Sequence, residues 1–440
     1  MSRAIIILGA SGDLAARKLI PALDQLYLRG EIDKESVIIG EGRRDIGNDE
    51  FREKSSCCDE MKSRMFYHKG LEGINAFMHS KGDFDRVVIF MALPPHAYAK
   101  TAGILSKEGF GSDVTLVVEK PFGYDYESAK ELNSALGTYF DESQIFRIDH
   151  YLAKEAVQNI LVFRFANMLF EPIWNNHYID SIQVNCFEDL GVEGRSAYFD
   201  SAGIIRDMVQ NHLIQLLALL TMEAPVSLSS ESIRHRKRDL LEQIEVEDWC
   251  KYQCEDYLTE PGIPSDSKTE TFGSIKMRIN SSRWHGVKIH IRAGKYMNRK
   301  GTEIGVKFKK LPPILFNSDN TIEENRIIFK IQPSEGIIID LASKVPGSDR
   351  QITGTTMKFC YSDHFGAAKV PEAYTKLLLD AIKCDKTLFV SAEESELSWK
   401  KFEAVLNDES SPLIYKKGEI PHGSCDTDWI DFDSYGSICE

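Results

Sequence analysis

The chain has 440 residues, of which 42% are hydrophobic and 27% charged, and a formal net charge of −14 at pH 7. This composition excludes a disordered or fibrous chain, and the acidic excess argues against a nucleic-acid-binding protein. One hydrophobic core rarely grows beyond roughly 250–300 residues, so we expect two domains. No apolar run approaches the ~20 residues of a membrane-spanning helix. Nine cysteines without C-x-x-C spacing, and an N-terminus without a secretion signal, indicate reduced thiols and a cytoplasmic location.

In the first third of the chain, short runs rich in Val and Ile alternate with helical patterns. Such runs are typical of strands buried on both faces of a parallel sheet. They cover residues 5–8, 37–40, 87–91 and 114–118, and helical spacing covers 14–26 and 126–136. Pro21 should kink the first helix or start a new turn. The alternation predicts a doubly wound α/β domain over residues 1–150.

After residue 150 the apolar residues recur mainly at every second position. The alternating runs are 276–279, 287–292, 326–331, 336–341 and 355–361, and helical stretches cover 151–166, 204–221, 371–382 and 393–406. Alternation of this kind predicts an antiparallel sheet with one face buried. We therefore expect residues 151–440 to form an α+β domain on a large, mainly antiparallel sheet, with a loosely held tail from residue 423.

A glycine-rich turn, Gly9-Ala10-Ser11-Gly12-Asp13-Leu14, joins the first predicted strand to a helix. Backbone N–H groups and the positive helix end would bind a pyrophosphate there. The spacing is G-x-x-G rather than G-x-G-x-x-G, so a purely structural turn remains an alternative.

The second strand ends in Gly40-Glu41-Gly42-Arg43-Arg44. At this position an acid favours a free ribose 2′-hydroxyl and an arginine favours a 2′-phosphate, so Glu41 and Arg43 compete. A solvated charge cluster is the alternative. Lys120 follows the strand 114–118, on the edge of the sheet where ligands bind.

The densest polar cluster spans residues 147–155. If a helix begins near Asp149, His150 and Lys154 share one face. With Tyr151 they place three donors at a helix N-terminus, which predicts a phosphate clamp. The alternative is an N-cap aspartate on a solvated helix.

His212 lies in the mostly apolar helix predicted over 204–221, where a lone histidine is more often a core residue than a catalyst. Asp207 lies five residues earlier, about 140° away on an α-helix, and is a poor partner for the imidazole. Asp149 is the better candidate. A histidine held by a carboxylate is suited to act as general base on an alcohol. The cations at 292–300 form either part of this site or a solvated loop.

Taken together, these segments resemble the glucose-6-phosphate dehydrogenase family. The resemblance covers residues 4 to about 420 and rests on specific motifs. They are GASGDLAARKL at 9–19, ALPP at 92–95, EKPFG at 119–123, RIDHYLAKE at 147–155, EGR at 193–195, YFDSAGIIRDMVQNHL at 198–213, IRAGK at 291–295 and IQP at 331–333.

The resemblance implies a Rossmann-like first domain and NADP-dependent oxidation of D-glucose 6-phosphate at C1. It makes His212 the catalytic base and Asp149 its partner. The implied substrate residues are Lys120, His150, Tyr151, Lys154, Glu188, Asp207, Lys295, Lys300 and Gln332, with Lys18 nearby. The implied cofactor residues are Gly9, Ala10, Ser11, Gly12, Asp13, Leu14, Ala15, Ala16, Arg43 and Lys120.

Family membership further implies a homodimer or homotetramer formed through the large sheet, and no metal. Gly301 and Gly305 stand where some family members carry basic residues for a second, structural NADP, so we expect that second site to be absent. Two alternatives stay open: a related two-domain dehydrogenase of a free sugar, and a non-catalytic homologue that senses NADPH or a sugar phosphate.

Overall fold

A computed structural model describes residues 2–192, 194–312, 323–348, 351–366, 372–421 and 428–439. The chain forms two compact units. The first consists of Met1–Ala153, Pro225–Arg238 and Pro371–Lys400, and the second of Lys154–Ala224, Asp239–Val370 and Lys401–Glu440. Two later segments, predicted to lie within 151–440, thus belong to the first unit.

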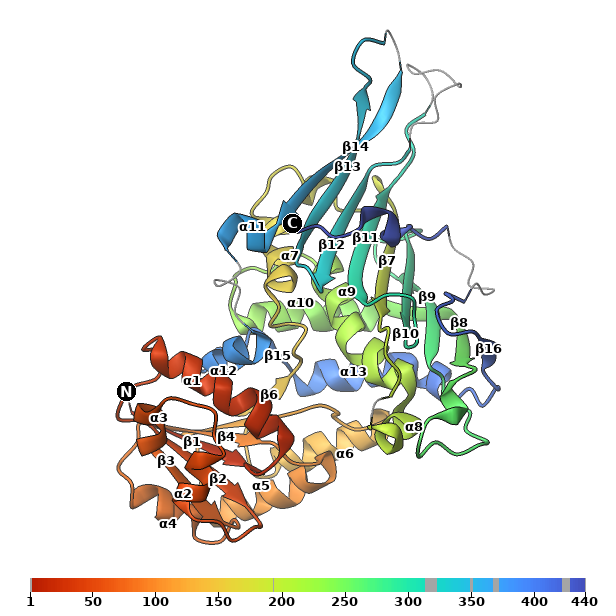
Figure 1. The fold of residues 1–440 in the computed structure, drawn as a ribbon. Helices are drawn as coiled ribbons and strands as arrows, with labels where there is room; N and C mark the ends of the chain where they lie inside the picture. Colours follow the sequence, from red (N-terminus) through yellow and green to blue (C-terminus); the bar gives the residue numbers. More distant parts are fainter. Residues whose placement is uncertain are drawn as a thin grey trace. The chain divides into compact units, whose positions relative to one another are not determined.

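The first unit is built on a seven-stranded sheet (Figure 1, red to orange, with β15 in blue). Its strands are β1 (Arg3–Leu8), β2 (Val37–Gly42), β3 (Met65–Lys69), β4 (Arg86–Met91), β5 (Val114–Val118), β6 (Ile145–Ile148) and β15 (Phe389–Val390). Their order is β15-β6-β5-β4-β1-β2-β3, and only β15 pairs antiparallel. This is the doubly wound order, in which ligands bind where the strand order reverses, at the carboxyl ends of β1 and β4.

Three helices of this unit were predicted from periodicity, over residues 14–26, 126–136 and 371–382, and the other helices were not predicted. The helices of this unit are α1 (Ile20–Leu28), α2 (Asn48–Glu53), α3 (Asp59–Ser63), α4 (Ile74–His79), α5 (Tyr98–Lys107), α6 (Tyr126–Gly137) and α12 (Ala373–Lys383), with the π-helical η1 (Ala15–Leu19) and the 3₁₀ turn η2 (Pro95–Ala97). Pro21 lies in the first turn of α1, so a new helical segment does begin there. Helices α10 (Ser230–Gln243) and α13 (Ala392–Leu406) begin in the first unit and end in the second.

The second unit is built on a nine-stranded sheet. Its strands are β7 (Ile179–Phe187), β8 (Ile244–Cys254), β9 (Phe272–Ile279), β10 (Lys288–Gly294), β11 (Gly301–Phe308), β12 (Arg326–Gln332), β13 (Gly336–Lys344), β14 (Ile352–Cys360) and β16 (Leu413–Tyr415). The order is β14-β13-β12-β11-β7-β10-β9-β8-β16. Only β7–β10 and β8–β16 pair parallel, so the mainly antiparallel sheet is confirmed.

Helices cover one face of this sheet, and the C-terminal segment lies on the other. The helical elements of this unit are α7 (Glu155–Phe165), α8 (Ser196–Ile204), the π-helical η4 (Ile205–Leu213), α9 (Ile214–Thr221), α11 (Tyr361–Phe365) and the 3₁₀ turns η3 (Glu171–Ile173) and η5 (Tyr257–Thr259). A further 3₁₀ turn, η7 (Phe432–Tyr435), belongs to the C-terminal segment. Phe329 of β12 meets Phe163 of α7, with ring centroids 5.1 Å apart. Its neighbour Ile328 packs with Ile430 and Phe432. Successive strand residues point to opposite faces, so α7 and the C-terminal segment lie on opposite sides.

The described part of the tail corrects two expectations. Residues 428–439 are not loosely held, because Ile430, Phe432 and Ile438 are buried. Cys360 and Cys439 form a disulfide bond, so the expectation of reduced thiols is wrong for this pair. The tail folds back along the sheet and brings together two cysteines that lie 79 positions apart in the chain. Residues 422–427 lie outside the described ranges.

None of the helices in the described ranges combines the length and the apolar character that crossing a bilayer requires.

Candidate active site

The turn after β1 holds the glycines predicted to bind phosphate. Gly9 has a φ of +81°, and a Cβ at this position would collide with the carbonyl oxygen of Ala92, at the end of β4. Only glycine lets the turn pass this close to the neighbouring strand. The N–H groups of Gly9 and Ala10 donate to the carbonyl oxygen of Glu41, at 3.0 and 2.8 Å. The predicted cofactor residues Gly9, Ala10, Ser11, Gly12, Asp13, Leu14, Ala15 and Ala16 all lie in this turn and the first helical turn.

This turn fits the phosphates of a dinucleotide. The first N–H groups of a helix have no partners within the helix. Helical backbone begins at Asp13, so these N–H groups and the positive helix end are available to an anion. Beside the turn lies a pocket of about 110 Å³, whose lining includes Ala10, Ser11, Arg44 and Lys54. The rest of the lining is mainly apolar and includes Ala16, Ile20, Ile46 and Phe51.

Glu41 and the arginines have different environments in the folded chain. Glu41 is 5% exposed, and its Oε2 accepts a hydrogen bond from the Gly9 N–H at 3.4 Å. Burial raises the pKa of this carboxyl. Arg43 and Arg44 are exposed. The carboxylate thus braces the glycine turn, and the arginines are the groups available at the tip of β2.

Glu119 and Lys120 directly follow the last residue of β5, at the end of the sheet where ligands are predicted to bind. Burial raises the pKa of Glu119 to about 7, although a hydrogen bond from Tyr374 on α12 opposes the shift. The Glu119 carbonyl oxygen accepts a hydrogen bond from the Tyr98 hydroxyl at 2.9 Å. The motif at 119–123 contains Glu119, but the sequence assigns this residue no role, because its partner Tyr374 lies 255 positions away in the chain.

We expect Glu119→Gln to raise the free energy of unfolding at pH 8 by about 1–3 kcal/mol and to change it little at pH 5. The pKa of Glu119 is raised from 4.5 to about 7. The native state therefore binds this proton more tightly than the unfolded chain, and wild-type stability falls as pH rises from 4.5 through 7. Glutamine does not titrate. Urea denaturation at both pH values measures the difference, with the exposed Glu131→Gln as control. An equal effect at the two pH values would contradict the assignment.

The segment Asp149–Lys154 is a turn, so the prediction of a helix from Asp149 is wrong. Helix α7 begins only at Glu155. The Asp149 carboxylate accepts a hydrogen bond from the Tyr151 N–H at 2.9 Å, and its carbonyl oxygen accepts one from the Leu152 N–H at 3.1 Å. An aspartate that bonds its own neighbouring backbone stabilises a turn in place of a helix. The ring centroids of His150 and Tyr151 lie 5.0 Å apart.

His212 lies in the π-helical segment η4 and is fully buried. Asp207, in the same segment, is also buried, and its Oδ1 accepts a hydrogen bond from the Tyr198 hydroxyl at 3.4 Å. In a π-helix each backbone hydrogen bond joins residues five apart. Asp207 and His212 are therefore closer in angle than the 140° expected for an α-helix. Segments of this kind occur frequently at functional sites.

Four predicted sugar-phosphate residues lie at one end of the central strands β12, β11, β7 and β10 of the second sheet. We call this end of the strands the edge of the sheet. β7 and β10 run parallel and end in register, with Phe187 opposite Gly294. β11 runs antiparallel and begins opposite Phe187, and β12 ends opposite Thr302. Strand register thus gathers Glu188, Lys295, Lys300 and Gln332 at this edge. Segment η4 packs against β7 and β10, which places His212 in the layer beside them.

The side chains at this edge have distinct environments. Lys295 is buried, at 3% exposed, and forms an ion pair with Glu188. The Gln332 amide donates a hydrogen bond to the Thr302 hydroxyl at 3.1 Å. Lys300 is exposed.

Lys154 belongs to the same group of residues. Burial lowers the pKa of its ammonium; Glu335 and Cys186 oppose this shift, and Lys300 adds to it. The Glu335 carboxylate also accepts the Ala156 N–H at 2.7 Å, in the first turn of α7. Sequence reasoning missed Glu335, because only the fold brings it from the turn after β12 to the start of α7.

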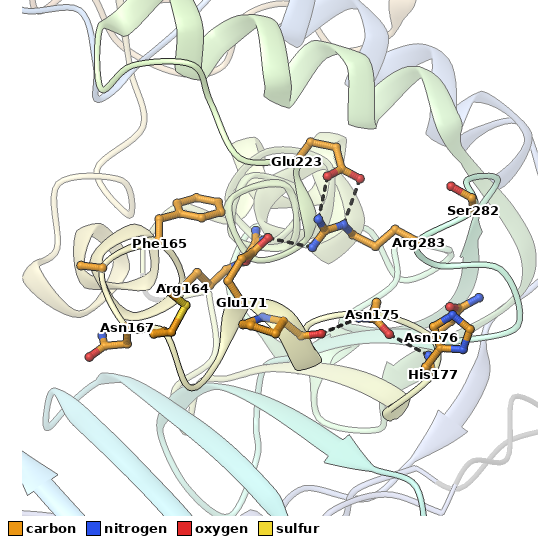
Figure 2. A pocket seen from close by; sticks show the side chains of 13 residues that line it. Arg164, Phe165, Asn167, Glu171, Asn175, Asn176, His177, Glu223, Ser282 and Arg283 are labelled. Carbon is orange, nitrogen blue, oxygen red and sulfur yellow. Dashed lines mark hydrogen bonds and ion pairs between the residues drawn. The ribbon is translucent and has the colours of Figure 1, made fainter.

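A pocket of about 880 Å³ in the second unit is a different site. Figure 2 shows the Arg283 guanidinium between Glu223 and Glu171, with contacts of 2.9 and 2.8 Å. The lining contains none of the predicted site residues. It includes Asn175 to His177, which precede β7, whereas Glu188 follows the strand. Nine strand residues span roughly 30 Å.

Each unit thus gathers its own part of the predicted site. The first contains the glycine turn, Arg43, Lys120, Asp149, His150 and Tyr151, and the second contains Lys154, Glu188, Asp207, His212, Lys295, Lys300 and Gln332. Lys18 is exposed and forms an ion pair with Glu372 at 3.6 Å, within the first unit.

A doubly wound sheet with a glycine-rich turn in one unit, and a buried histidine beside a cation-rich end of the sheet in the other, fit a two-domain nucleotide-dependent oxidoreductase. Comparisons with known proteins agree. Residues 6–159 match the family described as glucose-6-phosphate dehydrogenase, NAD binding domain, and residues 161–426 match its C-terminal domain. The chain therefore belongs to the glucose-6-phosphate dehydrogenase family.

Individual relatives are similar over nearly their whole length. Glucose-6-phosphate 1-dehydrogenase 5, cytoplasmic, of Arabidopsis thaliana is 37% identical, over 95% of this chain and 87% of that protein. Glucose-6-phosphate 1-dehydrogenase of Bacillus subtilis is also 37% identical, over 91% and 90%. A solved structure of glucose-6-phosphate dehydrogenase in complex with glucose 6-phosphate has a TM-score of 0.91 at 36% identity and covers 96% of each chain.

Proposed function

We propose that this chain is a glucose-6-phosphate 1-dehydrogenase. It oxidises D-glucose 6-phosphate at C1 to 6-phospho-D-glucono-1,5-lactone and reduces NADP⁺ to NADPH, the first step of the oxidative pentose phosphate pathway. The observation that carries the proposal is the buried His212 in the layer beside a sheet edge lined by Glu188, Lys295 and Lys300. The family relatives support the same activity.

His212 acts as the general base. Its imidazole takes the proton of the C1 hydroxyl, and the charge that develops on the ring requires a carboxylate partner. We assign this role to Asp149, whose carboxylate is buried and held in a tight turn by the Tyr151 N–H. NADP⁺, when bound, supplies the hydride acceptor.

The sugar phosphate is held by basic, acidic, amide and hydroxyl side chains. We assign His150, Tyr151 and Lys154 to the phosphate, and Glu188, Asp207, Lys295, Lys300 and Gln332 to the remaining contacts with the sugar phosphate. Lys120 lies between cofactor and substrate. Lys154 is half-buried, so its interaction with a dianion is less screened than that of a surface lysine. The clamp contributes to the rate by holding C1 in position.

We expect Arg43→Ala to lower kcat/KM for NADP⁺ by about 10- to 100-fold, the value of a hydrogen bond to a charged group. The turnover with NAD⁺ should change only a few-fold, because NAD⁺ lacks the 2′-phosphate. Steady-state kinetics with both cofactors measure the change, and Arg29→Ala, another exposed arginine of the first unit, is the control. Equal losses with NADP⁺ and NAD⁺ would remove Arg43 from 2′-phosphate recognition.

The proposed function is tested by absorbance at 340 nm with glucose 6-phosphate or free glucose, each with NADP⁺ and NAD⁺. We expect the highest kcat/KM for glucose 6-phosphate with NADP⁺. A preference for free glucose would favour a related sugar dehydrogenase. Absence of turnover, with NADPH binding retained in a fluorescence titration, would favour a sensing homologue.

We further propose a homodimer or homotetramer that associates through the large sheet. Light scattering on the purified chain would test this proposal.

We also propose a cytoplasmic location. The relatives include cytoplasmic and chloroplastic isoforms, and disulfides such as Cys360–Cys439 are rare in the cytosol. Cell fractionation decides between the compartments.

A further inference from the structure

We infer that two adjacent residues before β9, Glu270 and Thr271, position the catalytic groups of the second unit. Glu270 is a positioning residue for His212, and Thr271, with Tyr415, is a positioning residue for Lys295. The inference rests on the proposed function and adds residues that touch neither substrate nor cofactor.

Glu270 holds the start of the segment that carries His212. Its backbone carbonyl oxygen accepts the Ile204 N–H at 3.0 Å, and its Oε1 accepts the Ile205 N–H at 3.2 Å. Ile205 is the first residue of η4. The first N–H groups of a helix lack partners within it, and a carboxylate there is also favoured by the helix dipole. Glu270 is buried, at 8% exposed, so this contact is shielded from water.

Gly203 makes room for that carboxylate. It interrupts the helical run with φ 70° and ψ 172°, a conformation that favours glycine. A Cβ at this position would collide with the Glu270 carboxylate. The break between α8 and η4, and with it the direction in which η4 begins, is thus defined by a glycine and the acid that fills the space beside it.

Thr271 and Tyr415 hold Lys295 through its backbone. The Lys295 N–H donates to the Thr271 carbonyl oxygen at 2.9 Å, and the Tyr415 hydroxyl donates to the Lys295 carbonyl oxygen at 2.7 Å. The hydroxyls of Thr271 and Tyr415 lie 3.0 Å apart. The base and a cation of the substrate site are therefore both anchored to one two-residue segment. A misplacement of 1 Å at a reacting group can cost about 10²-fold in rate.

The two parts of the inference predict different kinetic effects, one on kcat and the other on KM. Glu270→Ala should lower kcat by about 10- to 100-fold and leave the KM for glucose 6-phosphate within a few-fold. Glu270→Gln retains an oxygen acceptor for Ile205 and should restore most of kcat. Tyr415→Phe removes one neutral hydrogen bond to the Lys295 backbone and should raise that KM by about 3- to 10-fold with little change in kcat. Glu247→Ala, a surface acid on the neighbouring strand β8, is the control.

Amide hydrogen exchange provides a readout that does not depend on activity. Ile204 and Ile205 should exchange faster in Glu270→Ala than in wild type or Glu270→Gln. Gly203→Ala should also increase exchange there, and the double variant Gly203→Ala/Glu270→Ala should show a non-additive effect, because the two residues contact each other.

Wild-type kcat in Glu270→Ala, or equal losses in Glu270→Ala and Glu270→Gln, would overturn the assignment of Glu270. An unchanged KM in Tyr415→Phe would overturn that of Thr271 and Tyr415. If wild-type protein lacks activity on glucose 6-phosphate, the proposed function fails, and the exchange measurement still decides whether Glu270 holds η4.

Discussion

Replacing His212 with Asn is expected to lower kcat for glucose 6-phosphate by about 10²- to 10⁴-fold, the usual contribution of general base catalysis. Asparagine is close in size and polar, so the buried position should stay filled. It cannot take a proton from the C1 hydroxyl near neutral pH. The KM for glucose 6-phosphate should change little, because the phosphate is held by other side chains. Steady-state kinetics give kcat and KM, and calorimetric titration gives the affinity for the substrate.

A second buried histidine provides the matched control. His290 lies in β10 of the same unit, is 2% exposed, and has its ring centroid 5.6 Å from that of Trp429. His290→Asn should retain wild-type turnover. Near-normal kcat in His212→Asn, or an equal loss in His290→Asn, would show that His212 does not act as the base.

Lys154→Ala is expected to raise the KM for glucose 6-phosphate by about 10- to 100-fold, as for the loss of a hydrogen bond between charged groups. Burial lowers the pKa of this ammonium. Its charge, and with it the affinity for the phosphate, is therefore lost at lower pH than for an ordinary lysine as conditions become alkaline. Activity on free glucose, which has no phosphate, should be unchanged in the variant. Steady-state kinetics on both sugars measure this selectivity.

Lys309→Ala removes an exposed cation of the same unit and should leave both sugars unaffected. A Lys154→Ala variant that loses activity equally on glucose and glucose 6-phosphate would contradict a role in phosphate recognition. In that case Lys154 would serve mainly as a partner of Glu335 at the start of α7.

The central strands of the first unit, and its helices near residues 14–26 and 126–136, follow from local sequence patterns. The strand predicted over 114–118 has those bounds in the structure, and the helix predicted over 126–136 differs by one residue at its end. Strands buried on both faces are continuous apolar runs, and such runs are visible without tertiary information. Strand β3, helices α2 to α5 and the short β15 were not predicted. The two residues of β15 carry no pattern, and this strand exists only because it pairs with β6.

The second sheet shows where periodicity fails. β7 and β11 are buried along most of their length on both faces, so neither has the alternation that predicts a half-buried strand. Helix α7 begins late because the Asp149 side chain bonds the Tyr151 N–H, which favours a turn. The sequence left Glu41 and Arg43 as competing groups at the tip of β2, and only the fold shows that Glu41 is buried against Gly9 while Arg43 is exposed.

By itself, the sequence determined the two-part architecture, the glycine turn, the family, and the residue types of the candidate site, because local periodicity and short motifs carry that information. Tertiary structure alone decided which distant residues support them. Glu119 meets Tyr374, Glu335 meets the start of α7, and Glu270 meets η4. These contacts depend on strand register and helix packing between segments that are far apart in the chain, which no local pattern encodes.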